Sequence, residues 1–131
     1  MRHPLVLAAA LVVATTAGTV AAQSTAESDY VLQCRGCHGP EGAGVPGLVP
    51  GLGEMHAMLA TPEGRARLLR VPGIRQASLS DARLAALLRW AATRFAPDGD
   101  ASAVRPISTG EVTRLRGRAE AAQRGTSQML R

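Results

Sequence analysis

Aromatic residues, lysine and strand-like sequence are scarce or missing in this chain of 131 residues. Its three aromatic residues are Tyr30, Trp90 and Phe95, so aromatic side chains supply little of the bulk of a core. All 15 basic residues are arginine, and the formal net charge is +5 at pH 7. They form no basic patch interleaved with aromatic residues, which argues against nucleic-acid binding. The sequence has no strand pattern and no recognisable Ser/His/Asp set or carboxylate pair, so we expect an all-α protein that is not an enzyme.

Cysteine is also scarce: the chain has two, and both lie in the motif Cys34-Arg35-Gly36-Cys37-His38. A structural zinc site takes four ligands, usually from two paired clusters, and the other histidines of the chain are His3 and His56. A thioredoxin-like redox pair lies in a βαβ pattern, and no strand run flanks this motif. Zinc binding and disulfide chemistry are therefore the weaker alternatives for these cysteines.

The C-x-x-C-H spacing of the motif is the attachment sequence of c-type haem. Thiols three residues apart on a helix share one face, with about 5–6 Å between their Cβ atoms. This separation suits two thioether bonds to one edge of a haem. His38 follows Cys34 by four residues, so its imidazole rises from the same face toward the iron. We therefore expect one covalent haem c per chain, bound by Cys34 and Cys37, with His38 as an iron ligand.

The N-terminal stretch is typical of an export signal. A short basic segment (1–4) precedes an apolar segment (5–14) and a run of small residues (15–22) that ends in Val-Ala-Ala. We expect a signal peptide over 1–22 with cleavage after Ala22, which leaves a periplasmic chain of 109 of the 131 residues. An uncleaved membrane anchor is the alternative, but the apolar segment is shorter than the roughly 20 residues of a span. We expect no membrane span in the mature chain.

A first helix is predicted from Gln23 to Cys37. Ser24 and Glu27 form a capping box at its start. Its apolar stripe runs from Tyr30 and Val31 into the motif, so we expect the motif to continue the buried face of this helix.

Later helices have clear start signals at Thr61-Pro62 and Ser80-Asp81. We expect one helix to run to Arg70 and end at Val71-Pro72-Gly73, and another to run to about Phe95. A further capping box begins at Ser108. The expected organisation is a signal peptide (1–22), one domain (23–96) and a polar, partly helical C-terminal tail (97–131).

The motif, the Gly/Pro-rich segment 40–53 and the stretch 64–90 make the chain resemble the small class I c-type cytochromes of bacteria. The resemblance implies a cytochrome c fold, a small helical bundle wrapped around one haem. It implies that a proline carbonyl accepts the ring N–H of His38. Pro46 and Pro50 are the candidates, and Pro50 is preferred because Val-Pro-Gly-Leu at this point is similar to the family's P-x-L step. It also implies that the first and last helices of the domain cross, near Tyr30 and Trp90.

In this family a methionine just before the last helix of the domain is usually the second iron ligand. Here residues 71–80 contain no Met, His or Lys. Met55 is the favoured candidate, and Met58, His56 or an open position are the alternatives. Four arginines are candidates for pairing with the haem propionates through charge-assisted hydrogen bonds: Arg65, Arg67, Arg70 and Arg75.

The function implied by the resemblance is electron transport by single electrons on the haem iron. The implied partners are a periplasmic dehydrogenase as donor and an oxidase or another cytochrome as acceptor. The missing methionine in 71–80 motivates an alternative, a haem-based sensor or small-ligand-binding protein with an open iron position. A third possibility is an electron-transfer subunit that is stable only inside a dehydrogenase complex.

Overall fold

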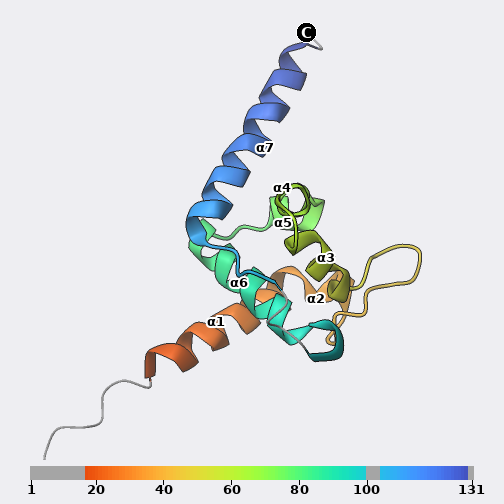
Figure 1. The fold of residues 1–131 in the computed structure, drawn as a ribbon, viewed down its shortest axis with the longest axis vertical. Coiled ribbons are helices and arrows are strands. Elements are labelled where there is room, and N and C mark those ends of the chain that lie inside the picture. The colour runs from red at the N-terminus through yellow and green to blue at the C-terminus, as the bar shows by residue number, and fades with distance from the viewer. Residues whose placement is uncertain (1–16, 100–103, 130–131) are drawn as a thin grey trace, which may run out of the picture.

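The computed structural model describes residues 17–99 and 104–129, and these residues form helices joined by loops (Figure 1). Within these ranges there is no β-strand, and the isolated bridge between Val45 and Val49 is the one extended pairing. The all-α class is therefore confirmed for the described residues. The elements in order are α1 (Ala17–Gln33), α2 (Arg35–His38), η1 (Leu52–Glu54), α3 (Met55–Leu59), α4 (Pro62–Leu68), α5 (Pro72–Gln76), α6 (Asp81–Arg94), η2 (Pro97–Gly99) and α7 (Thr109–Met129).

Helix α1 begins well before the predicted capping box. Its first residue is Ala17 and it continues through Ser24, so Ser24 does not start the helix and that prediction is wrong. The run from Ala17 to Ala22 contains no proline and is rich in alanine, so nothing in it ends a helix. Of the expected signal peptide, 1–16 lies outside the described residues, and 17–22 forms the first turns of α1. In the described part of the chain, no helix is long and apolar enough to cross a membrane.

The predicted single helix over 23–37 is divided at Cys34, whose φ and ψ are −126° and −36°. Helical hydrogen bonds nevertheless continue on both sides of the break. The N–H of Cys34 donates to the carbonyl of Tyr30 at 2.9 Å, and that of His38 donates to the carbonyl of Cys34 at 3.0 Å. Gly39 then ends α2 with a φ of +74°, a conformation that glycine adopts without strain. The chain therefore bends at the motif and stops directly after it.

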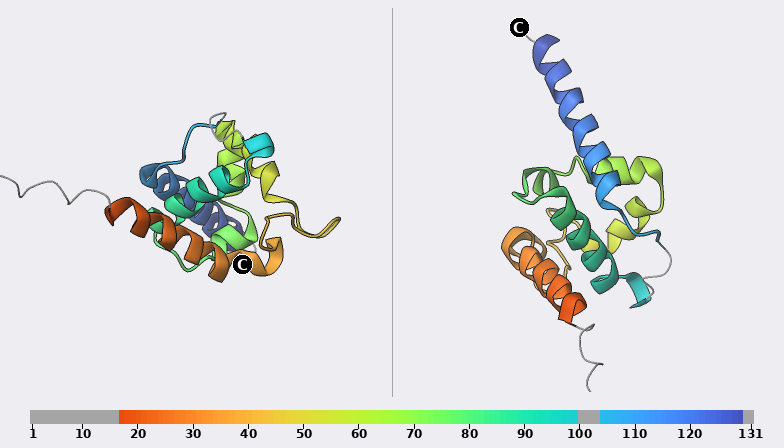
Figure 2. Two further views of the ribbon diagram at one scale, coloured as in Figure 1. Left: turned by 90° about the horizontal axis from the view of Figure 1, so that it is seen from below. Right: turned by 90° about the vertical axis from the view of Figure 1, so that its left-hand side faces the viewer.

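Helices α1 and α6 cross, and the contact between them gathers all three aromatic residues of the chain (Figures 1 and 2). The ring of Tyr30 lies 5.3 Å from that of Trp90 and 5.1 Å from that of Phe95, centroid to centroid. The rings of Trp90 and Phe95 meet edge to face at 5.8 Å. Such pairs contribute roughly 0.5–1.5 kcal/mol each beyond the burial of their surface. The prediction that Tyr30 and Trp90 lie near this helix contact is confirmed.

Helix α6 begins as predicted at Ser80, whose hydroxyl accepts a hydrogen bond from the N–H of Arg83 at 3.3 Å. Burying each leucine of its apolar stripe contributes about 2 kcal/mol. The helix packs against α1 and also against α7, so it is the centre of the bundle. The buried residues of this stripe are Leu84, Leu87, Leu88, Ala91 and Phe95.

Helix α4 also begins as predicted, with Thr61 accepting a hydrogen bond from the N–H of Gly64 at 3.0 Å. Gly64 allows α4 to approach α3, because a Cβ atom there would lie 2.2 Å from the carbonyl oxygen of Met58. The predicted end of α4 is wrong: the helix stops at Leu68, and Pro72 opens the separate helix α5. Proline suits a first helical position because its φ is already helical and its missing N–H is not needed there.

The segment after residue 96 is partly helical, as expected, and its beginning packs into the core. Ile107 and Val112 are buried, and the hydroxyl of Ser108 accepts a hydrogen bond from the N–H of Glu111 at 3.2 Å. Only the first turns of α7 are covered. The rest of the helix extends away from the bundle (Figures 1 and 2).

Candidate functional site

The residues of the C-x-x-C-H motif lie at the surface of the bundle, where α1 bends into α2. Cys34 is partly buried against the core, Cys37 is exposed, and His38 is partly exposed. Both cysteines are free thiols. Tyr30 is the last fully buried residue of α1, and Val31 after it is 45% exposed. Cys34 still packs against the core, whereas Cys37 is exposed and His38 is partly exposed. The expectation that the motif continues the buried face stays a prediction beyond Cys34.

The imidazole of His38 is oriented by a backbone carbonyl. Its Nδ1 lies 3.1 Å from the carbonyl oxygen of Pro50. A carbonyl only accepts, so Nδ1 carries the proton and donates it, and Nε2 keeps its lone pair. The preference for Pro50 over Pro46 is confirmed.

The loop between α2 and η1 brings Pro50 close to His38 because a glycine, Gly44, occupies the position where two parts of the loop backbone come closest. Gly44 has a φ of +71°, and a Cβ atom there would lie 2.3 Å from the carbonyl oxygen of Val49. The N–H of Gly44 donates to the carbonyl of His38 at 3.0 Å. Val45 and Val49 form the isolated bridge that closes the loop. The abundance of glycine in 40–53 was visible in the sequence, but which glycine is essential was not.

The aromatic cluster lies directly beneath this loop. The hydroxyl of Tyr30 donates a hydrogen bond to the carbonyl of Gly39. This buried phenol therefore has the hydrogen-bond partner that buried tyrosines usually find. Burial raises the pKa of Tyr30 above its ordinary value. A Cβ atom at Gly42 would lie 2.7 Å from the ring of Phe95. Contacts of α1 and α6 with the loop therefore position the motif.

The two weaker interpretations of the cysteines find no support in the described residues. Burial, the nearby Asp29 carboxylate and Cys37 raise the pKa of Cys34, whereas thiols that exchange disulfides have lowered pKa values. Among residues 17–99 and 104–129, no three His, Cys, Asp or Glu side chains gather where they could hold a metal ion. A haem iron takes at most two ligands from the protein, so this finding does not bear on haem.

The candidates for a second iron ligand have different surroundings. Met55 is buried in the hydrophobic core, and Met58 packs against that core while partly exposed. The Nε2 of His56 lies 2.6 Å from the carbonyl oxygen of Ala92, so this nitrogen carries a proton and lacks a free lone pair. The second ligand stays a prediction, with Met55 favoured.

Arg65 is not available to a haem propionate, because it is buried in an ion pair. Its side chain is 3% exposed, and its Nε lies 2.6 Å from Oε1 of Glu111. Its Nη1 donates to the carbonyls of Leu59 at 2.6 Å and Arg105 at 2.9 Å. The hydrogen bond from Arg65 holds the pKa of Glu111 down to about 2. The sequence does not reveal this pair, because Arg65 and Glu111 are 46 residues apart. The other three candidates for the propionates are exposed: Arg67, Arg70 and Arg75.

No protein-family model, no curated protein and no solved structure matches this chain. What the protein does is therefore inferred from its own residues, above all from the motif and the hydrogen bond between His38 and Pro50.

Proposed function

We propose that this protein is an exported c-type cytochrome that carries single electrons. Cys34 and Cys37 would hold one haem through thioether bonds, and His38 would be its proximal iron ligand. The haem supplies the reversible one-electron change of its iron. The observation that carries the proposal is the hydrogen bond from Nδ1 of His38 to the carbonyl of Pro50, which joins the motif to the loop that follows it.

This hydrogen bond gives His38 the form that an iron ligand needs. With Nδ1–H fixed on Pro50, the lone pair of Nε2 is free to bind a metal, and the bond increases the basicity of the ring. Among the described residues, Nε2 of His38 has no hydrogen-bond partner. The residues present therefore fit the group.

Exposed apolar side chains flank the motif along the chain. Large apolar side chains are exposed on both sides of the motif, with Leu32 before it and Leu48 in the loop after it, 75% and 79% exposed. Exposed apolar side chains of this size commonly mark binding surfaces when they gather. A flat apolar group attached at Cys34 and Cys37 would offer such side chains a partner.

The second iron ligand in this proposal is Met55, because a His/Met pair raises the reduction potential of a haem. The proposed location is the periplasm, after removal of a signal peptide over 1–22. The proposed partners are a dehydrogenase as electron donor and an oxidase or another cytochrome as acceptor. The protein would bind no organic substrate and would tune the iron through its ligands, burial and hydrogen bonds.

A second candidate function is the binding of small ligands at an open iron position. Two observations favour it: residues 71–80 contain no Met or His, and Met55 is packed into the hydrophobic core. An open position would allow carbon monoxide to bind ferrous haem readily, whereas a His/Met iron would resist it.

An optical spectrum of the full chain, expressed with export and haem maturation, tests both candidates. Electron transfer predicts a covalent haem, a low-spin ferrous spectrum and little change on adding carbon monoxide. A high-spin spectrum that shifts with carbon monoxide would favour ligand binding instead. The absence of covalent haem from a folded chain would contradict both.

Variants of the two methionines then locate the second ligand. Met55→Leu removes a thioether while keeping a similar apolar volume, and we expect it to convert the iron to a form that binds carbon monoxide. Met58→Leu is the matched control and should leave the spectrum unchanged. The opposite result would assign the ligand to Met58.

A further inference from the structure

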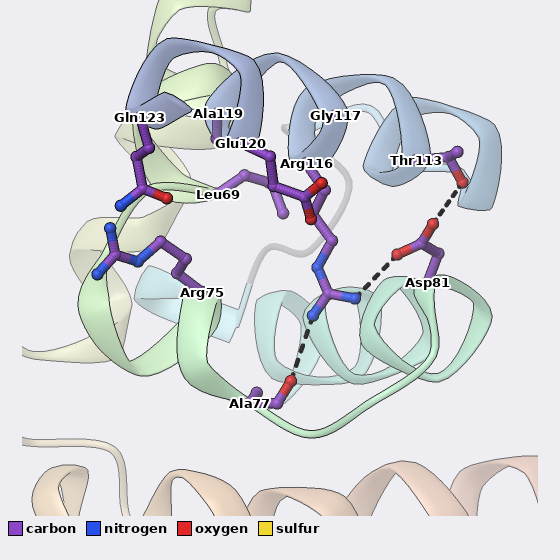
Figure 3. A pocket seen from close by; sticks show the side chains of 10 residues that line it. All are labelled: Leu69, Arg75, Ala77, Asp81, Thr113, Arg116, Gly117, Ala119, Glu120 and Gln123. Atoms are coloured by element: carbon purple, nitrogen blue, oxygen red, sulfur yellow. Dashed lines mark hydrogen bonds and ion pairs between the residues drawn. The ribbon is translucent and has the colours of Figure 1, made fainter. Parts of the chain in front are cut away.

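A groove runs between α7 and the segment that includes α5. It consists of a cavity of about 470 Å³ and a second of about 340 Å³, and the two share Arg75, Ala119 and Gln123 in their walls. Figure 3 shows the first cavity, with α7 along one side and the side chains of Arg75, Arg116 and Asp81 reaching into it. The first cavity is the inner end of the groove, and the second is its outer end.

Two of the charges at the inner end, Asp81 and Arg116, are paired with each other, and Glu120 adds a carboxylate that lies 3.9 Å from Arg124. The carboxylate of Asp81 accepts hydrogen bonds from the hydroxyl of Thr113 at 2.7 Å and from Nη1 of Arg116 at 2.9 Å. Arg116 also donates to the carbonyl of Leu79 at 2.8 Å. These bonds attach α7 to the start of α6 and hold the pKa of Asp81 below its ordinary value. The inner end therefore fixes the position of the helix, and its Glu120 carboxylate disfavours an acidic ligand at this end.

The charges at the outer end are unpaired and of one sign. Arg70 and Arg75 are exposed, and in the described part of the chain neither guanidinium has a hydrogen-bond or ion-pair partner. The opposite wall is one face of α7, and Figure 3 shows its Gln123 directed toward Arg75. The outer end has no carboxylate in its lining, which consists of Arg70, Arg75, Ala119, Ala122, Gln123, Thr126 and Ser127. Guanidinium, amide and hydroxyl groups together favour a ligand with carboxylates.

On the face of α7 that lines the outer end, Ala119 and Ala122 have small side chains, and we call these two residues the floor. Residues 120–129 of α7 are all exposed. A helical segment of this length is marginal in water unless its face is packed against something. Because its side chains are small, the floor has room for a polypeptide backbone. A polypeptide packed there would also stabilise the exposed part of α7.

We propose that this groove binds an acidic segment of a partner protein, with carboxylates on Arg70 and Arg75 and backbone against Ala119 and Ala122. A second copy of this chain fits less well, because the exposed side of α7 carries Arg114, Arg118 and Arg124, which repel the arginines of the groove. The lining includes no residue of the C-x-x-C-H motif, so the proposal does not depend on the proposed function. It assigns Arg70 and Arg75 to the partner protein in place of the haem propionates.

The test is the binding of a fluorescein-labelled oligoglutamate peptide to the full chain at low salt, measured by anisotropy. Ala122→Glu places a negative charge on the floor, and we expect the affinity to fall about tenfold or more, roughly 1.4 kcal/mol. Ala121→Glu is the matched control. It adds the same charge to the same helix at an exposed position that lines neither cavity, and it should change the affinity less than about threefold.

A second pair of variants separates the groove from the net charge of the protein. Arg70→Gln with Arg75→Gln should weaken binding about tenfold or more, whereas Arg67→Gln with Arg118→Gln, which removes the same charge elsewhere, should not. Equal losses in both pairs would overturn the proposal. Competition by free glutamate at the same carboxylate concentration would indicate a small-anion site and also overturn it. If the protein is a dimer and Ala122→Glu dissociates it, the groove binds a second copy and the proposal is overturned. Equal helical circular dichroism of the wild type and each variant serves as the control for folding.

Discussion

The region around His38 and the region around Glu111 both join distant segments of the chain, but by different means. Around His38, side chains donate to backbone carbonyls, as His38 does to Pro50 and Tyr30 does to Gly39. Around Glu111, charged side chains pair with each other, as Arg65 and Arg105 do with this carboxylate. The first region should therefore be sensitive to backbone shape, and the second to charge and pH.

The largest expected effect is the loss of Arg65 from the second region. Arg65→Met leaves the carboxylate of Glu111, whose side chain is 12% exposed, without its closest partner. Breaking a buried pair from one side typically costs about 3–5 kcal/mol. Because Arg105 still pairs with this carboxylate, we expect a loss of about 3 kcal/mol in the free energy of unfolding, measured by urea denaturation. Arg67→Met, at an exposed position of the same helix, is the control and should be nearly neutral. Similar losses in both variants would show that charge pairing does not hold this region.

The second prediction concerns pH. The pKa of Glu111 is about 2 in the folded chain and has an ordinary value of 4.5, so the pair stabilises the fold fully above pH 4.5. That stabilisation, about 3 kcal/mol by linkage, is lost as the pH falls from 4.5 to about 2. Asp81 also has a lowered pKa, so the measurement is the difference in unfolding free energy between the wild type and Glu111→Gln across this range. A difference that stays constant with pH would contradict the assignment.

The third prediction tests backbone shape around His38. Gly44→Ala brings a Cβ atom to 2.3 Å from the carbonyl oxygen of Val49 at a φ of +71°, and we expect a loss of about 2–3 kcal/mol in stability. Gly47→Ala is the matched control, because Gly47 has a φ of +74° and nothing within 4 Å of the added atom. It shares the backbone strain without the clash and should cost about 1 kcal/mol. Only Gly44→Ala should shift the imidazole resonances of His38, because it moves Pro50.

The smallest effect is expected at Tyr30. Tyr30→Phe keeps the ring in the aromatic cluster but removes the donor to the carbonyl of Gly39, which should cost about 1 kcal/mol. Tyr30 is the one tyrosine of the chain, so its phenolate absorbance can be titrated without interference. Its pKa should lie above the ordinary value of 10.0 because the phenol is buried. A pKa at or below 10.0 would mean that the hydroxyl reaches solvent.

The parts of the fold that follow from local chemistry could be predicted from the sequence. The sequence identifies Thr61, Ser80 and Ser108 as helix starts, because a cap needs only the next few residues. Ser24 has the same signal but lies within α1, because the alanine-rich residues before it allow the helix to start earlier. The sequence around Pro72 predicts the end of a helix but not the start of α5, because a proline can both end one helix and open the next.

The candidate site also has parts that can be predicted from the sequence and parts that cannot. The motif lies within five consecutive residues and could be read directly, and the choice of Pro50 came from the family resemblance. The pair of Arg65 with Glu111 and the contact of Gly42 with Phe95 could not be found, because they depend on how α4, α6 and α7 fold back on each other. Spacing along the chain contains no information about such pairs.

The aromatic cluster has one further consequence, for spectroscopy. Trp90 is the one tryptophan of the chain, and its ring touches Tyr30, whose hydroxyl is bound to the residue after His38. All tryptophan emission therefore comes from beneath the motif. A haem attached there would absorb that emission by energy transfer, so the fading of one fluorophore would report, in real time and without a label, the moment at which the cofactor joins the chain.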